Sequence, residues 1–166
     1  MQGQGHEVRQ AVNRRYGDFL ERKQFRVDSV GREIDAQKIH ALLFPFQKDI
    51  VKWAVKKGRC AVFLDTGMGK TFIQLEWARI LGQKTLIVAP LSVARQTARE
   101  GKKIGINVNY VRAQDEMGDG ISITNYEMVD GFSADCARAV ILDESSILKS
   151  LSGKTRSKLI KQFRAV

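Results

Sequence analysis

The stretch from residue 60 to residue 71 constrains the fold of this chain more than any other part of the sequence. An apolar run leads into a turn that contains Gly67 and Gly69, and Lys70 and Thr71 then open an amphipathic stretch. Glycine lacks a side chain and accepts a positive φ, so the backbone N–H groups of such a turn can approach a phosphate closely. The N-terminal end of a following helix adds partial positive charge. The pattern predicts a strand, a phosphate-binding loop and a helix, in that order.

The polar side chains of this loop are suited to ATP and Mg²⁺. We expect Lys70 to reach the β- and γ-phosphates and the Thr71 hydroxyl to ligate the cation. The residues of the loop that are predicted to bind the nucleotide are Thr66, Gly67, Met68, Gly69, Lys70 and Thr71. The general pattern G-x-x-x-x-G-K-S/T has a glycine where this chain has Leu64. A glycine turn that joins a strand to a helix without binding nucleotide is the alternative interpretation.

The 166 residues of the chain suffice for one domain with a core and are too few for two ordinary domains. No apolar run reaches the length of a membrane span, and residues 1–10 lack the apolar core of a secretory signal, so no membrane partner is expected. Cys60 and Cys136 lie far apart, which favours free thiols in a reducing cytoplasm. Because His6 and His40 are the only histidines, a Cys/His metal site is not expected.

Basic side chains outnumber acidic ones and give a formal net charge of +10. A balance of this size favours a polyanionic partner, above all nucleic acid. No acidic residue follows Glu144, and the basic residues beyond it are Lys149, Lys154, Arg156, Lys158, Lys161 and Arg164. This tail is suited to binding phosphates or to forming one side of an interface, and a generic basic surface is the alternative interpretation.

Helix-like and strand-like patterns alternate along the chain. Helices are expected over 10–24, 46–57, 70–81, 92–102 and 154–163. Strands are expected over 60–64, 85–89, 108–111, 121–124 and 139–142. Residues 27–45 are interpreted as a connector and 125–129 as a single helical turn. Apolar strands that alternate with helices predict an α/β fold with a mostly parallel sheet covered on both faces. They also predict a ligand at the carboxyl ends of the strands, where the glycine turn falls.

The apolar run over 139–142 ends in two carboxylates, Asp143 and Glu144. This is the form of a Walker B element, in which Asp143 would hold Mg²⁺ and Glu144 would orient and polarise the water that attacks the γ-phosphate. A strand that ends in a solvated acidic turn is the alternative interpretation. Because this element and the glycine turn lie in the expected order within the alternating pattern, the two signals support each other.

Gln47 is a third candidate, immediately after Phe44, Pro45 and Phe46. A glutamine amide can donate to and accept from the edge of an adenine base at the same time, and the Phe44 ring is suited to packing on the base. An ordinary glutamine near the start of a helix is the alternative interpretation.

Together these segments resemble the first RecA-like lobe of superfamily 2 helicases and DNA translocases, and most of all the chromatin-remodeller-like branch carried by phages and prophages. They read LFPFQ at 43–47, DTGMGKT at 65–71, LIVAPLS at 86–92, ITNYE at 123–127 and LDESS at 142–146, and SGKT at 152–155 extends the match. The resemblance implies a RecA-like P-loop fold. It also implies two parts, an N-terminal helix and connector over 1–42 and an ATP-binding lobe over 43–166.

The resemblance further implies roles for the residues at matching positions. Lys70, Asp143 and Glu144 would be the catalytic residues. The residues expected to line a nucleic-acid track are Pro90, Leu91, Ser92, Arg95, Thr124, Asn125 and Tyr126. Residues of this kind contact the backbone of the polymer, DNA in preference to RNA, so binding should be sensitive to salt and tolerant of sequence. A strand terminator at Pro90 and a packed aromatic at Tyr126 are the alternatives.

The family continues, after the segment that corresponds to this chain, with a Thr-Gly-Thr-Pro or Thr-Ala-Thr-Pro motif and a second RecA-like lobe that carries an arginine finger. The 166 residues include neither, so we expect this chain alone to bind ATP·Mg²⁺ weakly and to hydrolyse it very slowly. The family commonly ends the motif at 142–146 in a histidine, where this chain has Ser145 and Ser146. A self-contained P-loop phosphotransferase and a non-catalytic nucleotide- or nucleic-acid-binding module are the alternative functions.

Overall fold

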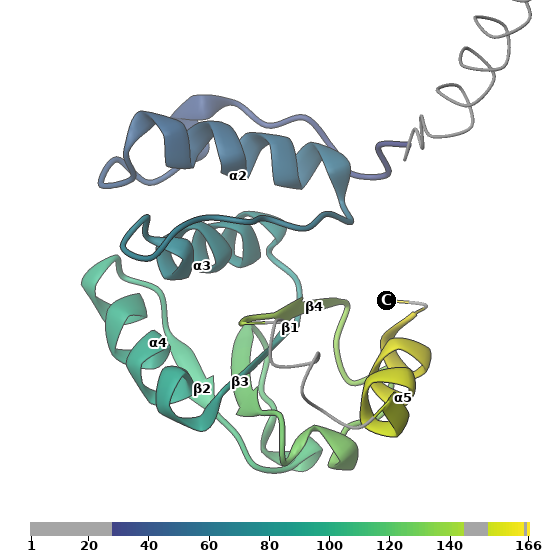
Figure 1. Ribbon diagram of the computed structural model, residues 1–166. Helices are drawn as coiled ribbons and strands as arrows, with labels where there is room; N and C mark the ends of the chain where they lie inside the picture. The colour runs from purple at the N-terminus through teal and green to yellow at the C-terminus, as the bar shows by residue number, and fades with distance from the viewer. Residues whose placement is uncertain (1–27, 145–152, 165) are drawn as a thin grey trace, which may run out of the picture.

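A computed structural model describes residues 28–144, 153–164 and 166, and these residues contain a four-stranded parallel sheet (Figure 1). The strands are β1 (Thr85–Ala89), β2 (Val108–Tyr110), β3 (Ile121–Asn125) and β4 (Ala139–Leu142). Their order is β2–β3–β1–β4, so β1 pairs with β3 on one side and with β4 on the other. The predicted α/β class and the predicted parallel sheet are confirmed.

Helices cover both faces of this sheet. Ile87 and Ala89 of β1 belong to a core with residues of α3 (Lys70–Leu81) and α4 (Leu91–Lys103). Leu86 and Val88 belong to the core on the opposite face, which includes Leu159 of α5 (Gly153–Phe163). A strand with a core on each face must be apolar at every position, and every residue of β1 is buried. The predicted covering of both faces is confirmed.

A further helix, α2 (Pro45–Lys57), packs on α3 and forms a third layer (Figure 1). Pro45 begins the helix, where its fixed φ costs nothing, and Gly58 ends it with a φ of +73°. The core between the two helices includes Val51 and Val55 of α2 and Ile73 of α3. The helix α3 is therefore held by α2 on one side and by the sheet on the other.

The connector before α2 contains the short 3₁₀ helix η1 (Ala36–Lys38). Its attachment to α3 depends on Glu76, whose side chain is fully buried. The Glu76 carboxylate accepts a hydrogen bond from the His40 backbone N–H at 2.7 Å and forms an ion pair with Arg79 at 2.6 Å. Burial raises the pKa of Glu76, but the Arg79 hydrogen bond and charge and the His40 N–H outweigh it and lower the pKa overall.

The predicted helices over 46–57, 70–81, 92–102 and 154–163 correspond to α2, α3, α4 and α5. The expected helical turn over 125–129 is a turn followed by the 3₁₀ helix η3 (Val129–Gly131). The 3₁₀ helices η1 and η2 (Gln114–Glu116) were not predicted. The helix expected over 10–24 lies outside the described residues. Within the described part of the chain, no helix combines the length and the apolar character that a membrane crossing requires.

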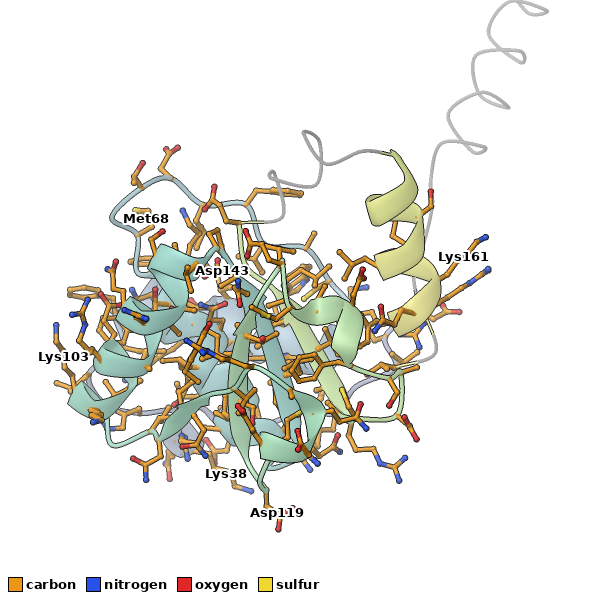
Figure 2. All side chains as sticks on the ribbon, turned by 90° about the horizontal axis from the view of Figure 1, so that it is seen from below. Lys38, Met68, Lys103, Asp119, Asp143 and Lys161 are labelled. Carbon is orange, nitrogen blue, oxygen red and sulfur yellow. The ribbon has the colours of Figure 1, made fainter. Side chains whose placement is uncertain are left out.

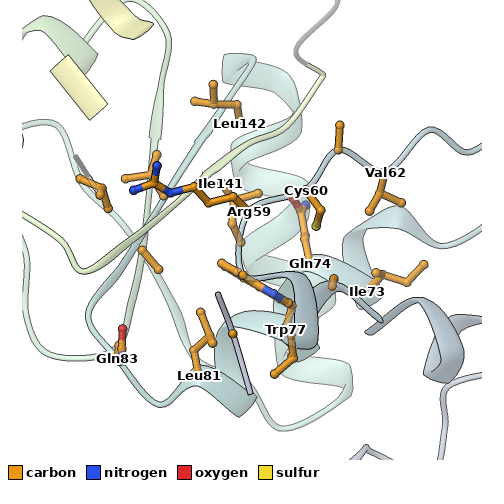
Figure 3. A pocket seen from close by; sticks show the side chains of 18 of the residues that line it. Arg59, Cys60, Val62, Ile73, Gln74, Trp77, Leu81, Gln83, Ile141 and Leu142 are labelled. Carbon is orange, nitrogen blue, oxygen red and sulfur yellow. The ribbon is translucent and has the colours of Figure 1, made fainter. Parts of the chain in front are cut away.

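The predicted strand over 60–64 is wrong. These residues belong to no strand of the sheet, and a cavity of about 830 Å³ separates residues 59–63 from β4 (Figure 3). A strand requires a neighbour at about 4.7–4.9 Å to accept its backbone hydrogen bonds, and the cavity removes that neighbour. The apolar run instead serves side-chain packing on one side, because Leu64 contacts the α2–α3 core whereas Phe63 is 88% exposed.

Candidate nucleotide-binding site

The glycine turn requires its two glycines for different reasons. Gly67 and Gly69 have φ of +81° and +72°, a left-handed conformation that side chains disfavour. A Cβ atom at Gly67 would meet no atom within 4 Å, so that position requires glycine for its backbone conformation alone. A Cβ atom at Gly69 would collide with Nε2 of Gln47, so that position also requires the absence of a side chain.

Gln47 holds this turn against the start of α2. Its side chain is buried, its Oε1 accepts from the Phe44 backbone N–H at 2.9 Å, and its Nε2 donates to the Met68 carbonyl at 3.0 Å. Both ends of the amide therefore have backbone partners, and the adenine contact predicted for Gln47 stays a prediction. The Phe44 ring is 65% exposed and stacks on Phe46 at 6.2 Å, so an aromatic face lies beside the turn.

Lys70 and Thr71 form the beginning of α3 directly after the turn. The positive end of the helix therefore lies at the turn, as a phosphate site requires. The Lys70 Nζ donates to the carbonyls of Leu64 and Asp65 at 3.0 and 3.2 Å. This ammonium group links the helix start to the end of the apolar segment, and it lies among the groups that were predicted to bind phosphate.

The acidic pair lies at the carboxyl end of β4, close to α3. Asp143 continues the strand by donating its backbone N–H to the Val88 carbonyl at 2.8 Å. Its carboxylate Oδ2 accepts from Nε2 of Gln74, one turn into α3, at 3.0 Å, and its Oδ1 accepts from the Glu144 N–H at 2.9 Å. Figure 2 shows Asp143 and Met68 of the glycine turn on the same side of the molecule. The helix after the turn and the acidic pair are thus joined directly.

Tyr126, which directly follows β3, supports Asp143. Its ring is buried, and its hydroxyl donates to the Asp143 carbonyl at 2.7 Å. Burial raises the pKa of Tyr126, and the charges of Asp143 and Glu144 raise it further, so the hydroxyl keeps its proton. Glu144 has a φ of +50°, a conformation that no other described non-glycine residue adopts, and its side chain is exposed. The two residues therefore differ in exposure, because Asp143 is half-buried and Glu144 is exposed.

The cavity beside β4 borders this site and does not contain it. Lys70, Gln74 and Asp143 lie on its wall, whereas 66–69 and Thr71 do not. The described residues include no group of three or more His, Cys, Asp or Glu side chains that could hold a metal ion. A single carboxylate with a hydroxyl suits Mg²⁺, which takes one or two protein oxygens and completes its shell with phosphates and water.

The residues predicted to line a nucleic-acid track separate into two groups. Leu91, Ser92 and Arg95 are exposed at the start of α4, after the half-buried Pro90. The other members are buried at the end of β3: Thr124, Asn125 and Tyr126. The two groups lie at the same edge of the sheet, because the last residues of β1 and β3 are paired. The role of these residues in binding nucleic acid stays a prediction.

Sequence reasoning did not single out Gln74. Its spacing provides a signal in retrospect, because a residue four positions after Lys70 lies on the same face of the helix. Nor did the sequence show that Tyr126 would contact Asp143, since the two residues meet only through the neighbouring strands β3, β1 and β4.

The chain matches no profile of a known protein family. It is similar to the DNA annealing helicase and endonuclease ZRANB3 of Bos taurus, with 30% identity over an alignment of 149 residues. The match covers 74% of this chain and 13% of that protein. The chain is a distant relative of this superfamily 2 helicase. The chain spans only a small part of the relative's length, so this similarity relates one region of ZRANB3 to the domain described above.

Proposed function

We propose that this chain is the ATP-binding part of a nucleic-acid-dependent ATPase, a DNA helicase or translocase of superfamily 2. The observation that carries the proposal is the hydrogen bond of 3.0 Å from Gln74 to Asp143, which joins the helix after the glycine turn to the acidic pair. In a strand that ended in an ordinary solvated turn, the carboxylates would contact solvent and not that helix. The distant relation to a DNA annealing helicase supports the same conclusion.

Each group of the site has a role in this proposal. The amides of the glycine turn and the Lys70 ammonium would hold the phosphate oxygens of ATP, and Thr71 and Asp143 would hold Mg²⁺, which when bound would neutralise phosphate charge. Glu144 would orient a water molecule and accept its proton as the water oxygen bonds to the γ-phosphorus. The bond between that phosphorus and the β–γ bridging oxygen would break, and ADP would leave. In superfamily 2 motors, a second RecA-like lobe completes a site of this kind.

The nucleic-acid partner follows from charge and exposure. The chain carries a net charge of +10, and Ser92 and Arg95 are exposed where α4 begins. A hydroxyl, an arginine and the amides of a helix N-terminus are groups that contact phosphates without reading bases. We therefore expect DNA binding that weakens with salt and depends little on sequence.

The substitution Lys70→Ala tests the nucleotide site. Loss of the ammonium removes a charged hydrogen-bond donor, so the affinity for ATP in the presence of Mg²⁺ should fall roughly tenfold or more. Equilibrium titration with a fluorescent ATP analogue measures the change. Lys52→Ala, which removes an exposed lysine of α2, is the matched control and should bind as the parent does. Unchanged binding by Lys70→Ala would refute the proposed site.

A further inference from the structure

Asp143 is held at four of its atoms. Its N–H donates to the Val88 carbonyl and its carbonyl accepts from the Tyr126 hydroxyl, which together fix its backbone. Its Oδ1 accepts from the N–H of the next residue, Glu144. The fourth contact, from Gln74 Nε2 to Oδ2 at 3.0 Å, differs from the others because a side chain of another element acts on the carboxylate itself.

The contact leaves the carboxylate able to bind a cation. Each carboxylate oxygen has two acceptor positions, and each oxygen of Asp143 accepts one of these hydrogen bonds. Counting the contacts of the described residues alone, a lone pair remains on each oxygen. The carboxamide of Gln74 is neutral, so it orients the Asp143 carboxylate and leaves its negative charge in place. A lysine or arginine at this position would cancel that charge. Among the described residues, no Lys, Arg or His side chain forms an ion pair with Asp143.

Gln74 is also well placed to hold a fixed position. Its neighbours Ile73 and Leu75 are buried on either side of α3, so the backbone at Gln74 is anchored between the α2 layer and the sheet. Figure 3 shows its side chain beside the cavity near β4, together with Trp77 from the next turn. A side chain on a rigid helix orients a partner better than one on a loop.

We infer that Gln74 is a positioning residue that orients the Asp143 carboxylate for Mg²⁺. The inference rests on the proposed function, because it assigns a further residue to the cation that Thr71 and Asp143 would hold. Removing a residue that orients a metal ligand typically lowers the affinity for the metal about 10–100-fold. Gln74 should therefore govern the Mg²⁺ dependence of nucleotide binding and leave metal-free binding unchanged.

The substitution Gln74→Met tests this directly, because methionine has a similar length and no amide. Binding of a fluorescent ATP analogue is titrated against Mg²⁺ and, separately, measured in EDTA. We expect the Mg²⁺ concentration at half-maximal binding to rise about tenfold or more, with binding in EDTA unchanged. Gln96→Met is the matched control, because Gln96 also donates to a carboxylate, that of Glu100, at 3.0 Å on the exposed face of α4. It should behave as the parent.

Two further variants separate positioning from folding. Gln74→Ala removes the amide without adding a new side chain and should give the same shift in the Mg²⁺ titration. In an Asp143→Ala background, Gln74→Met should add no further change, because the group through which it acts is gone. Thermal unfolding without nucleotide shows whether each variant is folded.

The outcomes distinguish the inference from the proposed function. If the parent chain binds no ATP, both are refuted. If the parent shows Mg²⁺-dependent binding and Gln74→Met has the same Mg²⁺ midpoint, the inference alone is refuted. Equal weakening in EDTA and in Mg²⁺ would also refute it, because Gln74 would then act on the glycine turn and not on the cation ligand.

Discussion

Two apolar stretches of similar length, β1 and the segment 60–64, have very different surroundings. Every residue of β1 is buried, and the strand pairs with β3 and with β4. The segment 60–64 lies across the cavity from β4, pairs with no strand of the sheet, and exposes 88% of Phe63. An apolar run therefore becomes a strand only where a neighbouring backbone is within reach of its hydrogen bonds.

The segment 60–64 is held by side-chain contacts and not by backbone hydrogen bonds to a neighbouring strand. Leu64 packs into the α2–α3 core, and its carbonyl accepts from the Lys70 ammonium. Gln47 then holds the following turn through the Met68 carbonyl. The position of the candidate phosphate loop thus depends on the α2–α3 layer, whereas the position of Asp143 depends on the sheet. The hydrogen bond from Gln74 to Asp143 joins the two supports at the site.

The comparison predicts a large difference between substitutions in the two stretches. Ile87→Ala in β1 should lower the free energy of unfolding by about 3–4 kcal/mol, because it leaves a cavity in a core that water does not reach. Phe63→Ala should change it by less than about 0.5 kcal/mol, since the ring is already exposed. Urea denaturation of both variants measures the difference. Similar losses for the two variants would mean that 60–64 is buried in solution.

The sequence predicted the elements that depend on local pattern. The strand over 85–89 and the helix over 70–81 have the predicted bounds, because an unbroken apolar run and a helical spacing after a glycine turn each report burial. The segment 60–64 has the same apolar signal, but its pairing depends on a neighbour elsewhere in the chain. The apolar pattern indicates which side chains are shielded from water. It does not indicate which other segment of backbone lies next to the run and pairs with it.

The candidate site shows the same division. The glycine turn and the Asp143–Glu144 pair are recognisable in sequence because their chemistry requires particular residues at fixed spacing. The contacts of Gln74 and Tyr126 with Asp143 are not recognisable, because each joins segments that are distant in sequence. For Gln47, the base contact suggested by the sequence stays a prediction, and the structure adds a backbone partner at each end of its amide that the sequence did not indicate.

The second prediction concerns the α2–α3 layer that holds 60–64. Glu76→Ala should destabilise the protein by about 2–3 kcal/mol, because it leaves the His40 N–H and the Arg79 guanidinium without their charged partner. Thermal and urea unfolding measure the loss. Glu33→Ala is the matched control, because its ion pair with Lys56 is exposed on both sides, and it should cause little measurable change.

The contribution of Glu76 should also depend on pH. The pKa of Glu76 is lower in the folded protein than in the unfolded chain, where a glutamate titrates at about 4.3. Stabilisation by this carboxylate is therefore complete above that pH and is lost as the pH falls through the folded pKa. The difference in stability between the parent and Glu76→Gln should be constant near neutral pH and should shrink in acid. A difference that grew in acid would contradict the assignment.

The third prediction concerns the turn that follows 60–64. Gly67→Ala should cost roughly 1–2 kcal/mol, the penalty for a side chain in the left-handed conformation. Gly69→Ala should cost about 1 kcal/mol more, because its Cβ displaces the Gln47 amide from the Met68 carbonyl.

The excess cost at Gly69 should disappear in a Gln47→Ala background, since the colliding amide and its hydrogen bond are then absent. Urea unfolding of the four proteins of this cycle measures the coupling. If the excess persists without Gln47, then contacts other than this amide limit the space at Gly69. The support of the turn would then be assigned to those contacts. The difference in burial between β1 and the segment 60–64 would not be affected, because Ile87→Ala and Phe63→Ala test it separately.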